Sequence, residues 1–104
     1  MYSMALFYTP CPSHTEAQKI ATHLLEQKLI ACAQIIPVTS MYWWDGKIAN
    51  DNEYVLIAKT LESVCSQITQ EIEKLHPYDI PCIMKLQMLV NEKYLAWAKK
   101  MVRV

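Results

Sequence analysis

The chain has 104 residues, of which 53% are hydrophobic, and its ten basic and ten acidic side chains cancel. This length predicts a single domain spanning residues 1–104. A balanced charge without a basic stripe argues against nucleic acid or an anionic membrane as the main partner, because phosphate binding requires clustered lysine and arginine. No segment reaches the ~18–20 apolar residues of a membrane span, and residues 1–8 lack the basic start of a signal peptide, so we expect a cytoplasmic protein.

The first predicted elements are a strand and a helix. Residues 4–8 form a short apolar run that predicts a central strand, which the prolines on either side of Cys11 should end. Ser13 and Glu16 have the spacing of a capping box, in which each side chain bonds to the other residue's backbone amide. Apolar residues at helical spacing follow, so residues 13–28 are predicted as an amphipathic helix.

A β-hairpin is predicted in the middle of the chain. Residues 31–36 and 41–44 are apolar runs, and residues 54–59 form a third. Asp45-Gly46 lies between them, and this pair is the strongest short-range signal of a hairpin turn because both residues tolerate positive φ. The sequence therefore predicts two antiparallel strands joined at this turn.

Two features are expected to disturb that hairpin. Pro37 cannot donate to a β-ladder, so the first strand should be an edge strand, or bulged, or both. The polar residues 49–53 are expected to widen the base of the hairpin or to bulge it.

The last part of the chain predicts a helix, a strand and a short terminal helix. Residues 61–75 carry apolar side chains at helical spacing, with Thr60 or Ser63 as the N-cap. Residues 82–88 alternate between apolar and polar after two prolines, which is typical of a strand with one wetter face. Asn91 is placed to cap the terminal helix.

The predicted order of elements is β-α-β-β-α-β followed by a helix. Right-handed crossovers would place both main helices on one face of a four-stranded antiparallel sheet. This is the ferredoxin-like split β-α-β arrangement, an α+β fold. No predicted element covers the other face of the sheet, so the simplest expectation is that a second copy of the chain covers it.

Two adjacent indoles also point to an oligomer. Trp43 and Trp44 are neighbours on one predicted strand and therefore face opposite sides of it. A domain of this size buries only about 60–68% of the surface that its unfolded chain exposes. The hydrophobic content of 53%, above the usual ~45–50%, and the two indoles therefore predict a subunit interface.

The chain resembles the CutA (divalent-cation tolerance) proteins along nearly its whole length. The matching blocks are Lys28-Leu29-Ile30-Ala31-Cys32, Ile35-Ile36-Pro37, Ser40-Met41-Tyr42-Trp43-Trp44-Asp45-Gly46-Lys47, Leu56-Ile57-Ala58-Lys59-Thr60, His76-Pro77-Tyr78-Asp79-Ile80-Pro81 and Tyr94-Leu95-Ala96-Trp97. The resemblance implies a compact homotrimer, built like the nitrogen-regulatory PII trimers, with clefts between neighbouring chains. It also implies a role in tolerance of copper and other divalent metals.

The chain departs from the family pattern at three places. The glycine that usually follows the Ile-Ile-Pro block is missing after Pro37, and Cys82 replaces an acidic residue. The family's assigned copper ligands are a cysteine late in the first strand and two histidines ending the second helix. Tyr8, Leu75 and His76 hold the corresponding positions here, so only one of the three ligands is kept.

The candidate metal ligands are His76, Cys82 and Cys11. His76 lies at a helix exit, where a neutral imidazole could take Cu²⁺, Zn²⁺ or Ni²⁺, or could instead bond to the last helix carbonyls. Cys82 suits soft or borderline ions, but is also a small residue that could fill the core. Cys11 precedes a helix N-terminus, where the dipole favours a thiolate, although an idle surface thiol is the simpler interpretation. With Cys32 and Cys65, these thiols show no Cys-x-x-Cys pair and are expected to be reduced.

A second set of candidates could line a ligand cleft or a subunit interface: Tyr42, Trp43, Trp44, Lys59, Tyr78 and Trp97. Aromatic side chains favour interfaces because of their area. The chain has no phosphate-binding glycine loop, nucleophile elbow or His-Glu-x-x-His pair, so we expect no enzyme and no obligatory cofactor. The first hypothesis is a homotrimer that binds copper or a similar ion, and the alternative is a PII-like trimer that senses a small molecule or acts as a scaffold.

Overall fold

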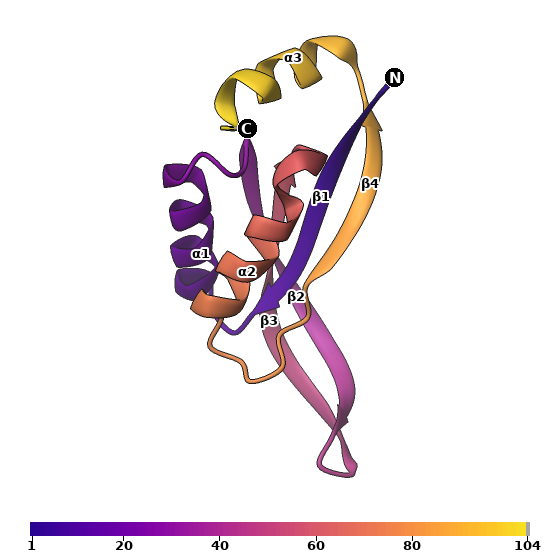
Figure 1. Cartoon of the computed structure of the whole chain (residues 1–104). Coiled ribbons are helices and arrows are strands. Elements are labelled where there is room, and N and C mark those ends of the chain that lie inside the picture. Colours follow the sequence, from indigo (N-terminus) through magenta and orange to yellow (C-terminus); the bar gives the residue numbers. More distant parts are fainter. Residues whose placement is uncertain (104) are drawn as a thin grey trace.

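The computed structural model describes residues 1–103, which form one four-stranded sheet and three α-helices (Figure 1). The strands are β1 (Tyr2–Cys11), β2 (Cys32–Trp44), β3 (Lys47–Thr60) and β4 (Met84–Val90), and the helices are α1 (His14–Glu26), α2 (Cys65–Leu75) and α3 (Glu92–Met101). A short 3₁₀ helix, Glu62–Val64, precedes α2. The predicted order of elements is confirmed. Within the described residues, no helix has the length and apolar character needed to span a bilayer.

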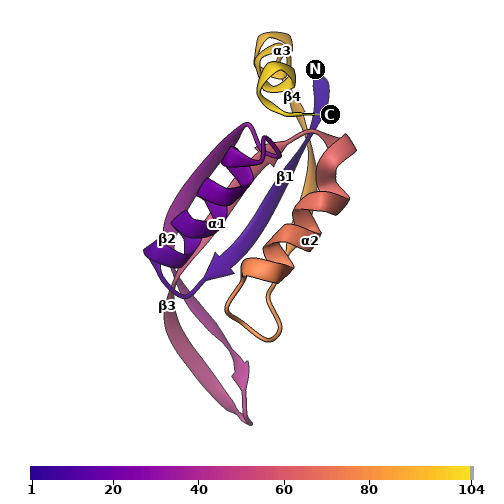
Figure 2. The ribbon, with the colours of Figure 1, turned by 60° about the vertical axis from the view of Figure 1, so that its left-hand side comes forward.

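The sheet has the strand order β2-β3-β1-β4, and each neighbouring pair is antiparallel. Both α1 and α2 cover the same face of this sheet (Figure 2), while α3 lies beyond its end, near the N-terminus (Figure 1). The α+β fold with a split β-α-β arrangement is thereby confirmed. The opposite face of the sheet carries no helix.

The β2–β3 hairpin is longer and more regular than expected. Its register runs without interruption from Cys32 opposite Lys59 to Trp44 opposite Lys47, so the predicted bulge is wrong. Pro37 is accommodated because β2 is an edge strand, as predicted. The turn is also confirmed, since Asp45 and Gly46 have φ values of 52° and 73°.

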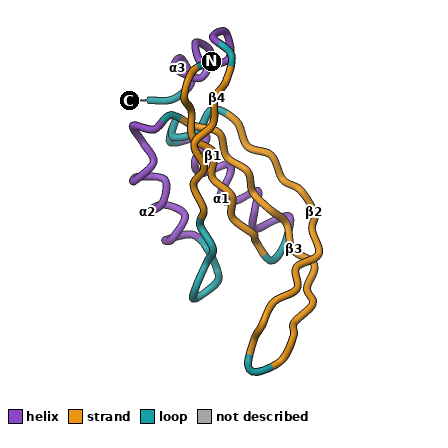
Figure 3. The backbone as a smooth tube through the Cα atoms, turned by 90° about the vertical axis from the view of Figure 1, so that its right-hand side faces the viewer, coloured by secondary structure: helices purple, strands orange, loops and turns teal. Residues whose placement is uncertain are grey.

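The outer half of this hairpin projects beyond the rest of the sheet (Figure 3). Strand β1 pairs with β3 only as far as Tyr54, so residues 38–53 pair only with one another. We call residues 38–53 the arm. The polar residues 49–53 form part of β3 within the arm, opposite residues 38–42 of β2.

Two element ends differ from the prediction. The prolines around Cys11 do not end β1 at Tyr8, because the strand continues to Cys11 along β3. Helix α2 has Val64 as its N-cap with no side-chain cap, and the Thr60 hydroxyl instead donates to the carbonyl of Leu29. The expected side-chain cap from Thr60 or Ser63 is therefore wrong. The cap of α1 is confirmed in part, since Ser13 Oγ accepts from the Glu16 amide at 3.1 Å.

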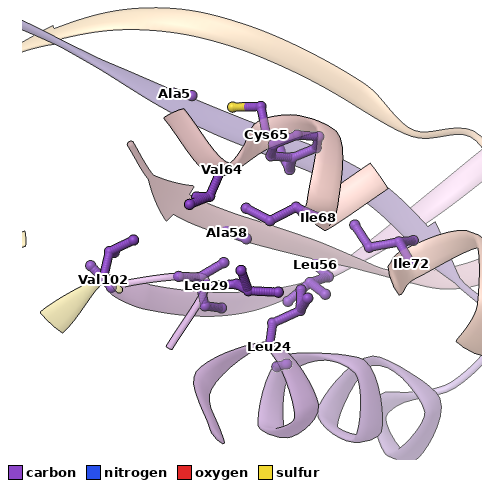
Figure 4. Close-up of a cluster of buried hydrophobic side chains, with 14 of the residues drawn as sticks. Ala5, Leu24, Leu29, Leu56, Ala58, Val64, Cys65, Ile68, Ile72 and Val102 are labelled. Atoms are coloured by element: carbon purple, nitrogen blue, oxygen red, sulfur yellow. The ribbon is translucent and has the colours of Figure 1, made fainter. Parts of the chain in front are cut away.

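The core lies between the sheet and the two helices that cover it (Figure 4). Ile20 and Leu24 of α1 and Ile68 and Ile72 of α2 are fully buried, and all four pack in one cluster with Phe7 of β1. Their spacing of three or four residues is what places them on one face of each helix. The sheet and helices therefore fix the positions of both ends of the segment that joins α2 to β4.

Candidate metal and ligand site

The segment between α2 and β4, residues 76–83, holds His76 against β1. His76 is only 7% exposed. Its Nδ1 accepts from the Tyr78 amide at 3.1 Å, so Nε2 carries the proton and donates to the carbonyl of Pro10 at 2.8 Å. The alternative in which His76 bonds to the last helix carbonyls is wrong. To bind His76, a metal ion would have to displace the hydrogen-bond partner of one of these two ring nitrogens.

Tyr78 connects His76 to the base of the arm. Its ring centroid lies 4.8 Å from that of His76, and its hydroxyl donates to Glu53 Oε2 at 2.6 Å. Burial, followed by this hydrogen bond, raises the pKa of Tyr78 above its usual range. Glu53 is itself buried, so the phenol keeps its proton and satisfies the carboxylate.

A second phenol–carboxylate pair lies further along the arm. The Tyr42 hydroxyl donates to Asp51 Oδ2 at 2.5 Å, and this bond is the main reason that the pKa of Tyr42 is raised. Sequence reasoning missed Glu53 and Asp51 as partners, although two acids in a strand beside tyrosines were a usable signal. The arm therefore carries two carboxylates, Glu53 at its base and Asp51 further out, each held by a tyrosine.

Cys82 and Cys11 lie in different surroundings from those expected. Cys82 is exposed, so the interpretation as core filler is wrong, and its carbonyl accepts from Thr9 Oγ1 at 2.7 Å. Cys11 is fully buried, and its Sγ donates to the carbonyl of Thr9 at 3.7 Å. The expected surface thiol is therefore wrong.

Burial also decides the protonation of Cys11. It raises the pKa of this thiol to about 11, with Glu16 and Glu53 adding to the shift. The thiolate predicted from the helix dipole is wrong, because loss of solvent outweighs the dipole. All four cysteines are free. Within residues 1–103, no three His, Cys, Asp or Glu side chains form a group that could hold a metal ion.

The predicted cleft residues fall into two groups at opposite ends of β3. Tyr42, Trp43 and Trp44 lie on the arm, where the two indoles are 74% and 67% exposed, and Tyr78 lies at its base. Lys59 is twelve residues from Lys47 along β3, which is about 40 Å at the rise of a strand. The two groups therefore cannot line one cleft within a single chain.

The group at the other end of β3 is centred on Tyr94 of α3, which sequence reasoning missed. Lys59 Nζ lies 5.6 Å from the Tyr94 ring centroid, and the Trp97 ring is 5.5 Å from the same ring. Burial, with a smaller contribution from Cys32, raises the pKa of Tyr94. The position of Tyr94 three residues before Trp97 on a helix was the available signal.

The helical side of the molecule also carries shallow grooves between α1 and α2. One is lined by His23 and Leu75 among others, and His23 Nε2 lies 3.5 Å from Glu71 Oε1. Another is lined by residues of α2, by Gln27 and Leu29, which follow α1, and by Arg103. Neither includes a predicted site residue, so the candidate chemistry lies elsewhere.

Comparison with known proteins places these features in a family. The family described as CutA1 divalent ion tolerance protein matches residues 5–101. The divalent-cation tolerance protein CutA of Pyrococcus horikoshii is 41% identical over 95 residues, which are 90% of this chain and 93% of that protein. CutA of Thermotoga maritima is 38% identical over 100 residues, 95% of this chain and 99% of that protein.

A solved structure agrees with the sequence comparison. The crystal structure of CutA1 from Ehrlichia chaffeensis has a TM-score of 0.94 to this fold and 36% sequence identity, covering 100% of this chain and 99% of that one. The resemblance stated from the sequence blocks is thus confirmed over almost the full chain. The chain belongs to the CutA1 divalent ion tolerance protein family.

Proposed function

We propose that the protein is a non-enzymatic homotrimer that acts in tolerance of divalent metal ions and binds Cu²⁺ or a similar ion near the clefts between subunits. Family membership carries the proposal, since its relatives are named for divalent-cation tolerance rather than for a reaction. The four free thiols support a reducing, cytoplasmic location.

The open face of the sheet supports the homotrimer. Leu6 alternates with the core residues Ala5 and Phe7, so it points away from the helices. Its cross-strand partner Leu86 shares that face and is half exposed, as is Met84 two residues earlier. An apolar sheet face with no helix over it favours burial against other copies of the chain.

His76 and Cys82 support a metal site that two subunits share. An imidazole and an exposed thiol together suit copper or zinc. Two such ligands leave a coordination shell incomplete, and a neighbouring subunit is the available source of further donors. Cys11 as a ligand stays a prediction. Metal binding there would have to displace the proton of a thiol whose pKa is raised to about 11.

Copper titration tests this site. We expect His76→Gln to weaken Cu²⁺ binding by at least about tenfold, because a carboxamide is a poor substitute for an imidazole ligand. Glutamine keeps a donor that can reach Pro10, which limits damage to the fold. Isothermal titration calorimetry of wild type and variant measures the effect, with Cys82→Ser as a second variant.

His23→Gln is the matched control for this titration, because His23 lies on α1 and belongs to the helical groove. It should bind copper as the wild type does. Circular dichroism establishes that each variant is folded. If folded His76→Gln and wild type give the same isotherm, His76 does not belong to the site.

The cation above Tyr94 favours a second candidate, a PII-like trimer that senses an anionic small molecule. Lys59 carries its charge over an aromatic ring beside Trp97, an arrangement that can hold an anion and a planar group together. A thermal-shift screen of nucleotides and metabolites should then find a compound that raises the Tm saturably. Lys59→Gln should abolish that rise. A screen in which copper alone raises the Tm would reject this candidate.

A further inference from the structure

Cys32, the first residue of β2, lies beside charged and polar groups that the proposed copper site does not use. It is directly opposite Lys59 in the β2–β3 ladder, so the two side chains leave the same face of the sheet, with Cβ atoms about 4.5–5.5 Å apart. Ala58 and Thr60, on either side of Lys59, are buried on the helical side. Cys32 and Lys59 therefore point to the face that carries no helix.

Helix α3 brings a phenol to the same place, at its end of the sheet (Figure 1). Burial is the main reason that the pKa of Tyr94 is raised, and Cys32 adds to the rise, in part through a side-chain hydrogen bond. Lys59 Nζ lies 5.6 Å from the centroid of the Tyr94 ring, within the range of a cation–π contact. The thiol of Cys32, the ammonium group of Lys59 and the phenol of Tyr94 thus form one group, which we call the thiol cluster.

The surroundings of Cys32 differ from those of the other thiols. Cys11 and Cys65 are buried, and burial raises the pKa of both, that of Cys11 to about 11. Cys82 is exposed on the segment before β4. Cys32 is half-buried, between a lysine and a hydroxyl that both donate hydrogen bonds. A partly accessible thiol in electropositive surroundings is the usual setting of a reactive cysteine.

The thiol cluster is also suited to an anion. Within residues 1–103, Lys59 makes no ion pair with an acid, whereas Lys85 is paired with Glu62. Trp97 is 41% exposed, and its ring centroid lies 5.5 Å from that of Tyr94, so an accessible aromatic surface borders the cluster. A small molecule with a carboxylate therefore finds a counter-charge in Lys59 and a surface for its apolar part in Trp97.

We propose that Cys32 is a site of reversible modification by a small disulfide that carries carboxylate groups. The Cys32 sulfur, after losing its proton to water, attacks one sulfur of the disulfide and forms a mixed disulfide with it. The other sulfur leaves as a thiolate and takes up a proton, so the products are the modified protein and one small thiol. The exchange consumes no further oxidant, and an excess of the small thiol reverses it.

Lys59 acts at two stages of this exchange. It attracts the carboxylate of the incoming disulfide, and with the Tyr94 hydroxyl it stabilises the negative charge that three sulfurs share in the transition state. A neutral disulfide gains only the second effect, whereas an anionic one gains both. The structure therefore predicts a preference for anionic disulfides that depends on Lys59. This inference goes beyond the proposed function and requires no bound copper.

Reaction with glutathione disulfide tests the site in a parent chain that carries Cys82→Ser, which removes the exposed thiol. Intact mass spectrometry with peptide mapping measures the rate and locates the modified residue. We expect one modification per chain, at Cys32, which a further Cys32→Ser abolishes. The neutral hydroxyethyl disulfide is the second reagent. The ratio of the two rates should fall at least about tenfold in Lys59→Gln, because the attraction of the anion is lost.

Three further variants separate charge from structure. Lys59→Arg keeps the charge and should keep the ratio of the two rates. Lys19→Gln, on the outer face of α1, changes the net charge as Lys59→Gln does and should leave the ratio unchanged. Tyr94→Phe keeps the ring but removes the hydroxyl, so it should slow both reagents alike. Circular dichroism establishes that each variant is folded.

Several results would overturn the proposal. One is modification of Cys11 or Cys65 in place of Cys32, and another is a rate ratio that is the same in the parent chain and in folded Lys59→Gln. A Cys32 that reacts only after unfolding in urea would be a packing residue and no modification site. None of these results touches the copper titration, because Cys32 is not a candidate copper ligand, so failure here leaves the proposed function intact.

Discussion

Replacing Trp43 and Trp44 by serine should turn the assembled protein into folded monomers. The two indoles are 74% and 67% exposed in the single chain, so they stabilise the monomer little. An indole buried at the centre of an interface contributes about 2–4 kcal/mol, and each subunit would lose two. Sedimentation equilibrium should give three times the 12.1 kDa chain mass for wild type and a single chain mass for the variant.

Leu25→Ser is the control for that experiment, because Leu25 is also exposed but lies on α1, away from the arm. It should remain trimeric. The arm lies outside the hydrophobic core, so the serine variant should keep the far-ultraviolet circular dichroism of wild type. A wild type that is monomeric, or a serine variant that stays trimeric, contradicts the interface role of the indoles.

Phe7→Ala should have the largest effect on the free energy of unfolding. Phe7 is 1% exposed and lies in the middle of β1, where it packs in the core between the sheet and both covering helices. Deleting a buried phenyl ring costs about 3–5 kcal/mol, because the cavity left behind collapses only in part. Urea unfolding at one fixed protein concentration measures the loss, since the stability of an oligomer depends on concentration.

Leu25→Ala provides the matched comparison for Phe7→Ala. It shortens a side chain that is 43% exposed and lies outside the core cluster, and surface substitutions usually change stability by about 0.5 kcal/mol or less. A loss for Phe7→Ala as small as that for Leu25→Ala would mean that the core lies elsewhere than between β1 and the two helices.

The sequence predicts most of the fold because its strongest signals are local. Asp45-Gly46 takes the positive φ values that its turn requires, and Ser13 caps α1. Pro37 predicts an edge strand, and β2 lies at the edge. The errors concern element ends, such as the missing side-chain cap of α2, where the Thr60 hydroxyl bonds to Leu29 thirty-one residues away. A choice between a local and a distant partner depends on the finished tertiary structure.

The site is less predictable because its contacts join distant parts of the chain. His76 bonds to Pro10, sixty-six residues earlier, and Tyr78 bonds to Glu53, twenty-five residues earlier. Residue types alone left the role of His76 open between metal ligand and helix cap. Cys11 is buried because β1 continues past Pro10. The prolines on either side of Cys11 predicted an earlier end of the strand, so this burial was not expected.

Pro37 has a consequence for the outer edge of β2. Pairing runs unbroken through Pro37 opposite Tyr54, so the missing amide must face away from β3. An incoming strand would find no donor at that point of an otherwise open edge. Pro37 thus hinders the addition of further strands to the exposed edge of the hairpin. A Pro37→Ala chain should be more prone to form fibrils than the wild type.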